Sequence, residues 1–132
     1  MPLVRFNVPQ ALSADRLAGL RDAVHEALVA FANVPQDDRF HIVHRFDPEA
    51  LLLDAEFPGH ARSPDAVIVE ITFRLGRTDD QKKGLFREIA RLARARAGMQ
   101  PDDVMVVLSE NTSLDWSFGG GVAHYAQTPL PA

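Results

Sequence analysis

The sequence predicts an α/β (α+β) protein made of two copies of one strand–helix–strand unit. A strand-like segment, an amphipathic helical segment and a second strand-like segment follow one another in residues 2–45, and this order recurs in residues 66–110, about 65 residues later. A unit of this length implies a crossover that joins parallel strands. Two such units predict a four-stranded sheet with both helices on one face, in a single domain that spans residues 1–132.

The first unit opens with residues 2–8, where apolar and polar side chains alternate as in a strand with one buried face. Ser13 is a suitable N-cap for a helix, and the apolar residues that follow it keep helical spacing as far as Phe31. A second strand is predicted at residues 39–44, after a polar turn.

The second unit repeats these signals. Its strands are predicted at residues 66–73 and 105–108. Thr78 begins the intervening helix and forms a capping box with Gln81, and Gly98 is a suitable C-terminal stop.

Two helices cover only one face of the predicted sheet. The other face carries residues such as Ile68 and Thr72, so we expect a homo-oligomer whose sheets pack around an axis. The tail beyond Asn111 is predicted to form a C-terminal hairpin, with a short strand at residues 122–125. Such a hairpin reaches a neighbouring subunit more readily than it stands alone.

Composition excludes several classes of protein. The net charge of -4 argues against nucleic acid as a partner, and the absence of cysteine excludes disulfides and thiolate chemistry. No apolar run reaches transmembrane length and no signal pattern opens the chain, so we expect a cytoplasmic protein without a membrane partner. The five histidines form no ligand set, and no nucleotide-binding glycine motif is present, so neither metal nor cofactor is expected.

Pro2 is the first candidate catalytic residue. Removal of Met1 leaves a free secondary amine, and terminal amines have pKa values of about 7.7–8.0 that burial and nearby charge shift. Such an amine can act as a base, an acid or a nucleophile towards a carbonyl. Proline is also tolerated at the start of a strand for purely structural reasons.

Arg74 and Arg77 bracket a turn at the start of the second helix, where backbone donors also favour an anion. Two guanidinium groups there could clamp a carboxylate, although solvated surface arginines are the plainer alternative. They meet Pro2 only if the first strands of the two units run antiparallel. Asp38 could orient the prolyl nitrogen, but its echo, Asp103, favours a structural role in a turn for at least one of these acids.

Several short motifs together resemble the tautomerase superfamily, and within it the malonate semialdehyde decarboxylases. The most specific motif is Asp115-Trp116-Ser117-Phe118-Gly119, and the resemblance spans nearly the whole chain. It implies paired β-α-β units, a homotrimer and a catalytic N-terminal proline. The implied catalytic residues are Pro2, Asp38, Arg74 and Arg77, and the implied substrate-binding residues are Trp116, Phe118 and Tyr125.

The chain departs from these decarboxylases at two of the implied positions. Two residues separate Arg74 from Arg77 where the decarboxylases have one, and Tyr125 stands where they have phenylalanine. The resemblance implies a cofactor-independent decarboxylase that converts malonate semialdehyde, a small 3-oxo acid, to acetaldehyde and carbon dioxide. The alternatives are a tautomerase or hydratase of 2-oxo or unsaturated acids such as phenylenolpyruvate, and a trimeric binding protein that keeps the fold without catalysis.

Overall fold

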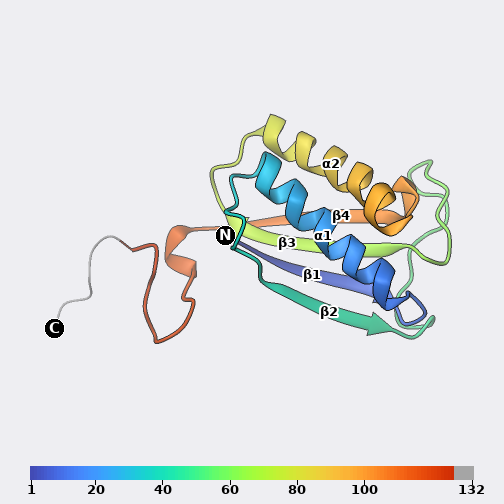
Figure 1. Cartoon of the computed structure of the whole chain (residues 1–132), viewed down its shortest axis with the longest axis horizontal. Coiled ribbons are helices and arrows are strands. Elements are labelled where there is room, and N and C mark those ends of the chain that lie inside the picture. Colours follow the sequence, from blue (N-terminus) through green and yellow to red (C-terminus); the bar gives the residue numbers. More distant parts are fainter. Residues whose placement is uncertain (127–132) are drawn as a thin grey trace.

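The protein folds into two layers, a four-stranded sheet and a pair of helices that cover one of its faces (Figure 1). The computed structural model describes residues 1–126. The strands lie in the order β2-β1-β3-β4, as expected for two β-α-β units. The elements are β1 (Pro2–Pro9), α1 (Ala14–Phe31), β2 (His41–Phe46), β3 (Val67–Arg74), α2 (Asp79–Ala97) and β4 (Val104–Asn111), with 3-10 turns at Pro101–Asp103 and Ser113–Asp115.

The strand register makes the two units nearly equivalent. Val4 of β1 pairs in parallel with His41 of β2, and Val67 of β3 pairs in parallel with Val104 of β4, 37 residues further along in each case. Between the units, β1 and β3 run antiparallel with Pro2 opposite Phe73. A local two-fold axis therefore relates the units, and the start of β1 lies at the same end of the sheet as the end of β3.

The helix ends follow the predicted capping signals. The Ser13 hydroxyl accepts a hydrogen bond from the Arg16 amide, and Thr78 and Gln81 form a reciprocal capping box. Gly98 ends α2 in the left-handed conformation, with φ of 60°, which glycine adopts without a steric penalty. These three predictions are confirmed.

The core lies between the sheet and the helices. Alternate side chains of β1 and β3, including Phe6 and Phe73, are fully buried against α1 and α2. The helices pack closely at two glycines, which have no Cβ atom. A Cβ atom at Gly19 would overlap the backbone of Arg96, and one at Gly84 would overlap the ring of Phe31. The two glycines occupy corresponding positions in the two units, so both units contribute the same feature to the contact between the helices.

The predicted C-terminal hairpin is wrong. Among residues 112–126 there is no strand: Ser113–Asp115 form a 3-10 helix and the remaining described residues form turns and coil. The Asp115 carboxylate accepts hydrogen bonds from the amide and hydroxyl of Thr112, which turns the chain immediately after β4. Positive φ angles at Gly119, Gly120 and Gly121 interrupt the extended backbone that strand pairing needs. The tail instead projects from one end of the sheet (Figure 1).

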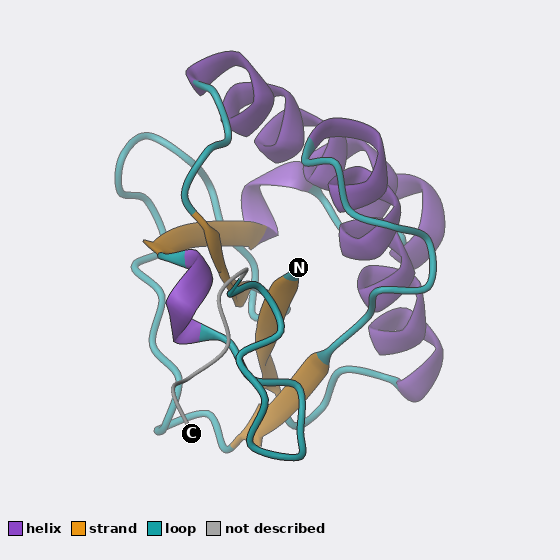
Figure 2. Cartoon of the chain, turned by 90° about the vertical axis from the view of Figure 1, so that its left-hand side faces the viewer, coloured by secondary structure: helices purple, strands orange, loops and turns teal. Residues whose placement is uncertain are grey.

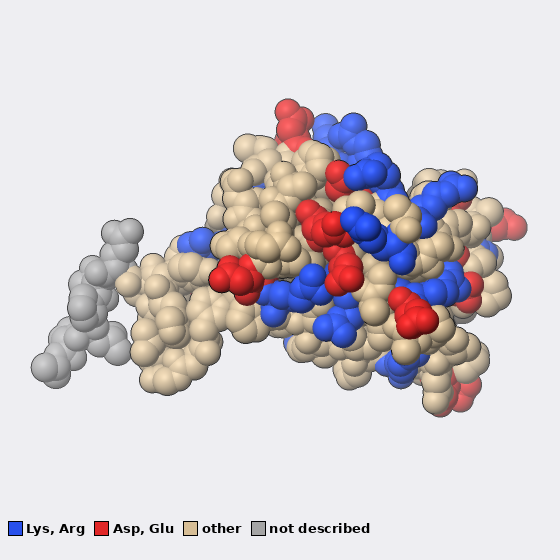
Figure 3. All heavy atoms as spheres, viewed as in Figure 1, with Lys and Arg blue, Asp and Glu red and all other residues tan. Residues whose placement is uncertain are grey.

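The helix side carries many charged side chains (Figure 3), and the open sheet face exposes apolar ones. Over the helices, acidic and basic side chains are interspersed (Figure 3), and pairs such as Arg96 with Glu26 and Lys82 with Glu110 explain this mixture. The open sheet face bears partly exposed apolar side chains, with Met105 and Val107 each 41% exposed. Within residues 1–126, neither helix combines the length and apolar character that a membrane span requires.

We predict that His41 makes stability depend on pH. Burial, and then the charges of Arg21 and Arg39, lower the pKa of His41 from 6.5 to about 4. The unfolded chain therefore takes up a proton below pH 6.5 that the folded protein does not. The free energy of unfolding should fall by about 1–2 kcal/mol between pH 6.5 and 4, allowing for partial solvent screening.

Urea titrations of the wild type and His41→Gln across this range measure that contribution. At pH 8 neither protein binds a proton at this position, so the difference there reports lost contacts alone. The wild type should approach the variant as the pH falls. A constant difference between the two proteins would contradict the prediction.

Candidate active site

The start of the chain lies against a carboxylate in a largely buried site. The Met1 amino group is 3.0 Å from Oδ2 of Asp38, and the two side chains are only 2% and 16% exposed. Asp38 reaches this point because its turn leads into β2, the parallel neighbour of β1, and the Val4 amide donates to the Phe40 carbonyl across the gap. In Figure 2 the N-terminus lies beside the loops of the tail.

The surroundings of the amino group have opposing effects on its protonation. Burial lowers the pKa of the Met1 amine most strongly, and Asp38 raises it through a hydrogen bond and its charge. The positive charges of Arg77 and Arg74 lower the pKa further. An amine in this position is therefore easier to deprotonate than an exposed terminal amine.

Asp38 and Asp103, which occupy corresponding positions in the two units, make different contacts. Asp103 is 2% exposed, and its carboxylate accepts hydrogen bonds from the amide and hydroxyl of Ser63 and from the Gln100 side chain. This is the structural turn role expected for one of the two acids. Asp38 instead faces the amino group, and its Oδ1 atom has no hydrogen-bond partner among the described residues.

Arg77 is held by the protein itself. Its Nε donates to the Ala32 carbonyl at 3.0 Å, its Nη1 donates to the Arg74 carbonyl at 3.1 Å, and its guanidinium lies 4.8 Å from the centre of the Phe73 ring. Burial, followed by the charge of Arg74, lowers the pKa of Arg77. These contacts fix the guanidinium and use part of its donor capacity, so Arg77 is not a free surface arginine.

Arg74 is less constrained. Its guanidinium stacks on Tyr125, 3.7 Å from the ring centre, and its only side-chain hydrogen bond among the described residues is a 3.5 Å contact from Nη1 to the Ser113 hydroxyl. With Arg77 it lines a polar cavity of about 220 Å³ at the start of α2. Arg74 therefore keeps most of its donors available for an anion.

Aromatic side chains of the tail form a wall beside Arg74. The rings of Trp116 and Phe118 stack with centres 6.1 Å apart, and Tyr125 meets Phe118 edge-on at 5.6 Å. The Trp116 indole donates to the Asn111 side chain at 2.6 Å, which orients it. A wall of this kind excludes water from one side of a bound molecule.

Sequence reasoning missed two members of this wall. The ring of Phe40 lies 5.7 Å from that of Phe118, and His124 accepts a hydrogen bond from the Phe118 amide at 3.0 Å. Phe40 lies two residues after Asp38, directly before β2. Its closeness in the chain to a candidate catalytic residue could have predicted a place near the site. The contact of His124 depends on tail turns that no periodic pattern predicts.

All seven candidate residues thus lie at one end of the sheet. The antiparallel pairing of β1 and β3 supplies the arrangement that the sequence left open, because it sets Pro2 opposite Phe73 and hence beside Arg74. Among residues 1–126, no group of three or more histidine, cysteine or acidic residues could hold a metal ion. This end of the sheet therefore combines a terminal amine of lowered pKa, a carboxylate, two guanidinium groups and an aromatic wall.

Known proteins resemble this chain in sequence and fold. Two family models, both described as tautomerase enzyme, match residues 38–119 and 2–61. The probable tautomerase YusQ of Bacillus subtilis (strain 168) is 30% identical over 123 residues, which cover 93% of this chain and 97% of the relative.

Solved structures agree with these matches. Malonate semialdehyde decarboxylase, solved as a structural basis for its decarboxylase and hydratase activities, has a TM-score of 0.87 and 32% identity, covering 93% of this chain and 95% of its own. A symmetric trimer of fused 4-OT has a TM-score of 0.75 and 21% identity, covering 96% and 99%, and this likeness concerns the fold alone. On the matches of sequence and family model, the chain belongs to the tautomerase family.

Proposed function

We propose that the protein is a cofactor-independent decarboxylase of a small 3-oxo acid, converting malonate semialdehyde to acetaldehyde and carbon dioxide. The observation that carries the proposal is the buried start of the chain. Its amino group is 3.0 Å from Asp38, and the charges of Arg74 and Arg77 lower the pKa of this amine. The 32% identity to malonate semialdehyde decarboxylase, with a TM-score of 0.87, supports the choice of substrate.

Pro2 is the proposed catalytic amine, exposed when Met1 is removed. Loss of carbon dioxide from a 3-oxo acid leaves an enolate, so the enzyme must draw electrons towards the carbonyl. A protonated Pro2 does this by donating a hydrogen bond to the carbonyl oxygen. A neutral Pro2 does it by forming an iminium ion with the carbonyl carbon, releasing water. Asp38 holds the amine and assists proton movement.

The two arginines have different proposed roles. Arg74 binds the substrate carboxylate with its available donors and turns it out of the plane of the carbonyl, the orientation that favours cleavage. Arg77, already bonded to the carbonyls of Ala32 and Arg74, holds the turn and adds positive charge. Trp116 and Phe118 exclude water, which favours carbon dioxide as a leaving group.

A tautomerase or hydratase of 2-oxo or unsaturated acids is the second candidate. Its support is the 30% identity to a probable tautomerase and the phenol of Tyr125 on the aromatic wall, stacked on Arg74. In this alternative a neutral Pro2 acts as the base. A binding protein without catalysis is the third candidate. Mass spectrometry tests it, because a retained Met1 would leave Pro2 as an amide and favour the binding role.

Replacement of the arginines should separate their roles. Arg74→Ala should lose roughly 2–5 kcal/mol of transition-state stabilisation, seen as a fall in kcat with malonate semialdehyde, while the melting temperature stays unchanged. Arg77→Ala should lower both kcat and the melting temperature, because two carbonyls lose their donor. Arg91→Ala, on the exposed face of α2, is the matched control. Equal small effects of the Arg74 and Arg77 variants would contradict both roles.

Serine inserted between Met1 and Pro2 should abolish turnover without unfolding the protein. The insertion converts the prolyl nitrogen into an amide, which is neither basic nor nucleophilic. Pro2→Ala, which keeps a terminal amine in register, should retain part of the activity. Steady-state kinetics and circular dichroism of both variants measure this. Full turnover by the insertion variant would remove Pro2 from the mechanism.

We also propose that the protein is a homotrimer. The support is the open sheet face with Met105 and Val107 partly exposed, and the trimeric state of the fused 4-OT that shares the fold. Light scattering should give about three times the 14.6 kDa chain mass. Val107→Asp should lower the mass, whereas Lys83→Asp on α2 should not. A wild type that stays monomeric at micromolar concentration would contradict the trimer.

A further inference from the structure

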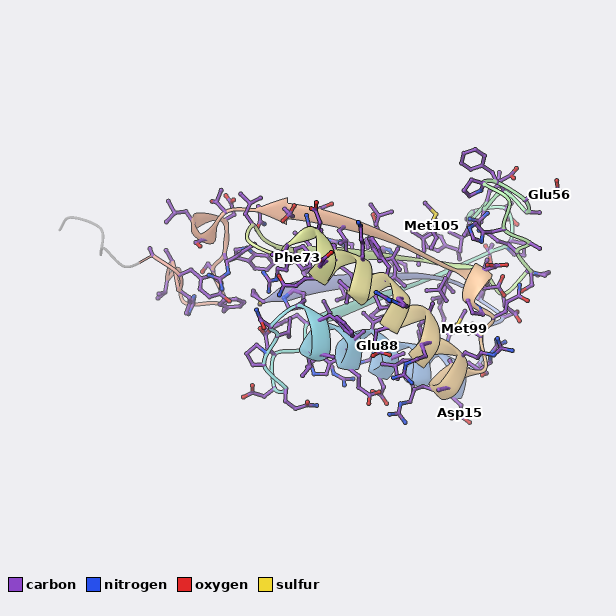
Figure 4. All side chains as sticks on the ribbon, turned by 90° about the horizontal axis from the view of Figure 1, so that it is seen from above. Asp15, Glu56, Phe73, Glu88, Met99 and Met105 are labelled. Carbon is purple, nitrogen blue, oxygen red and sulfur yellow. The ribbon has the colours of Figure 1, made fainter. Side chains whose placement is uncertain are left out.

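A large cavity lies at the end of the sheet opposite the candidate active site. It has a volume of about 600 Å³, within the range of small-molecule sites, and lies where β1 and β2 end and β3 begins. The insert between β2 and β3 forms one of its walls. In Figure 4, Glu56 of this insert lies at the far end of the molecule from Phe73 and the tail.

The local two-fold axis makes this cavity the counterpart of the candidate active site. The repeat of 65 residues joins the N-caps Ser13 and Thr78, and likewise Gly19 and Gly84. By the same count, the cavity-lining residues fall on positions of the active site. Pro9 corresponds to Arg74, Ala66 to Met1, and Leu51 and Leu53 to Trp116 and Phe118.

The lining of this cavity lacks the basic residues of the candidate active site. The position of Arg74 carries a proline, and that of Arg77 carries Leu12, so neither arginine of the anion site has an equivalent. No basic residue lines the cavity, and its charged lining residues are both acidic, Asp47 and Asp65. Of these, Asp65 is paired with Arg16 at 3.0 Å.

The cavity-lining segment just before β3 is held in place by hydrogen bonds. Asp103, the counterpart of Asp38, accepts hydrogen bonds from Ser63, which itself lines the cavity. The Ser63 hydroxyl in turn accepts from the Asp65 amide. The acid that faces the terminal amine in one unit therefore holds the cavity wall in the other.

We propose that this cavity is a second binding site, one that takes an uncharged apolar molecule. Leucine and proline side chains together with Phe46 supply the contact surface, and Asp47, which has no ion-pair partner among the described residues, disfavours an anionic ligand. The proposal does not depend on the reaction catalysed at the other end of the sheet.

Two fluorescent probes with the same rings test the site. N-phenyl-1-naphthylamine is uncharged, and 8-anilinonaphthalene-1-sulfonate carries a negative charge. Fluorescence titration of the full chain should show saturable binding of the uncharged probe, one per chain, about ten-fold tighter than the sulfonate. Failure to saturate, or equal affinity for the two probes, would overturn the proposal.

Substitutions inside and outside the cavity show where the uncharged probe binds. Leu51→Asp adds a charge to the cavity and Ala11→Trp fills it, and each should weaken binding of the uncharged probe at least about ten-fold. Leu114→Asp, an exposed leucine at the other end of the molecule, and Phe118→Ala should leave binding unchanged. Thermal melting identifies a variant that fails to fold, and the other variant then decides.

Loss of binding in Phe118→Ala, with full binding in Leu51→Asp and Ala11→Trp, would place the probe on the aromatic wall and overturn the proposal. Binding that appears only after dilution dissociates the oligomer would show that a second copy of the chain fills the cavity, and would overturn it equally.

Discussion

The antiparallel pairing of β1 with β3 is the constraint on which the candidate site depends. A β-α-β unit alone sends both of its strands in the same direction, so the start of one strand and the end of the other lie at opposite ends. Pairing two units antiparallel places Pro2 opposite Phe73, and therefore beside Arg74. Parallel pairing of the same strands would separate the chain terminus from both arginines by the length of the sheet.

Because the two units are nearly equivalent, the two ends of the sheet have similar backbone structures but different side chains. The strand registers and the close contact of the helices at Gly19 and Gly84 are shared. The side chains at the two ends are not. The first end carries the Met1 amino group, and at the corresponding place in the second unit Ala66 has an ordinary amide nitrogen within the chain.

Burial and charge act together at the terminus. Desolvation and two guanidinium groups destabilise a protonated amine, while the nearby Asp38 carboxylate stabilises it. Arg77 takes part in this balance without being free to bind a ligand with all its donors, because two carbonyls hold it. Both arginines act on the amine through their charge, but Arg74, with one side-chain hydrogen bond among the described residues, keeps more of its donors free than Arg77.

Sequence alone determined the elements with local causes. Periodicity located the strands and helices, and capping at Ser13, Thr78 and Gly98 located the helix ends, because each signal involves residues within one turn of one another. The candidate residues were also identified from sequence, through motifs that resemble a family. Only the tertiary structure decided how they meet: the direction of β3 against β1, the anchoring of Arg77 by Ala32, and the place of Phe40 in the wall. These are contacts between residues that are distant in the chain. The tail forms turns instead of the expected hairpin because of local hydrogen bonds and backbone angles, which strand periodicity does not encode.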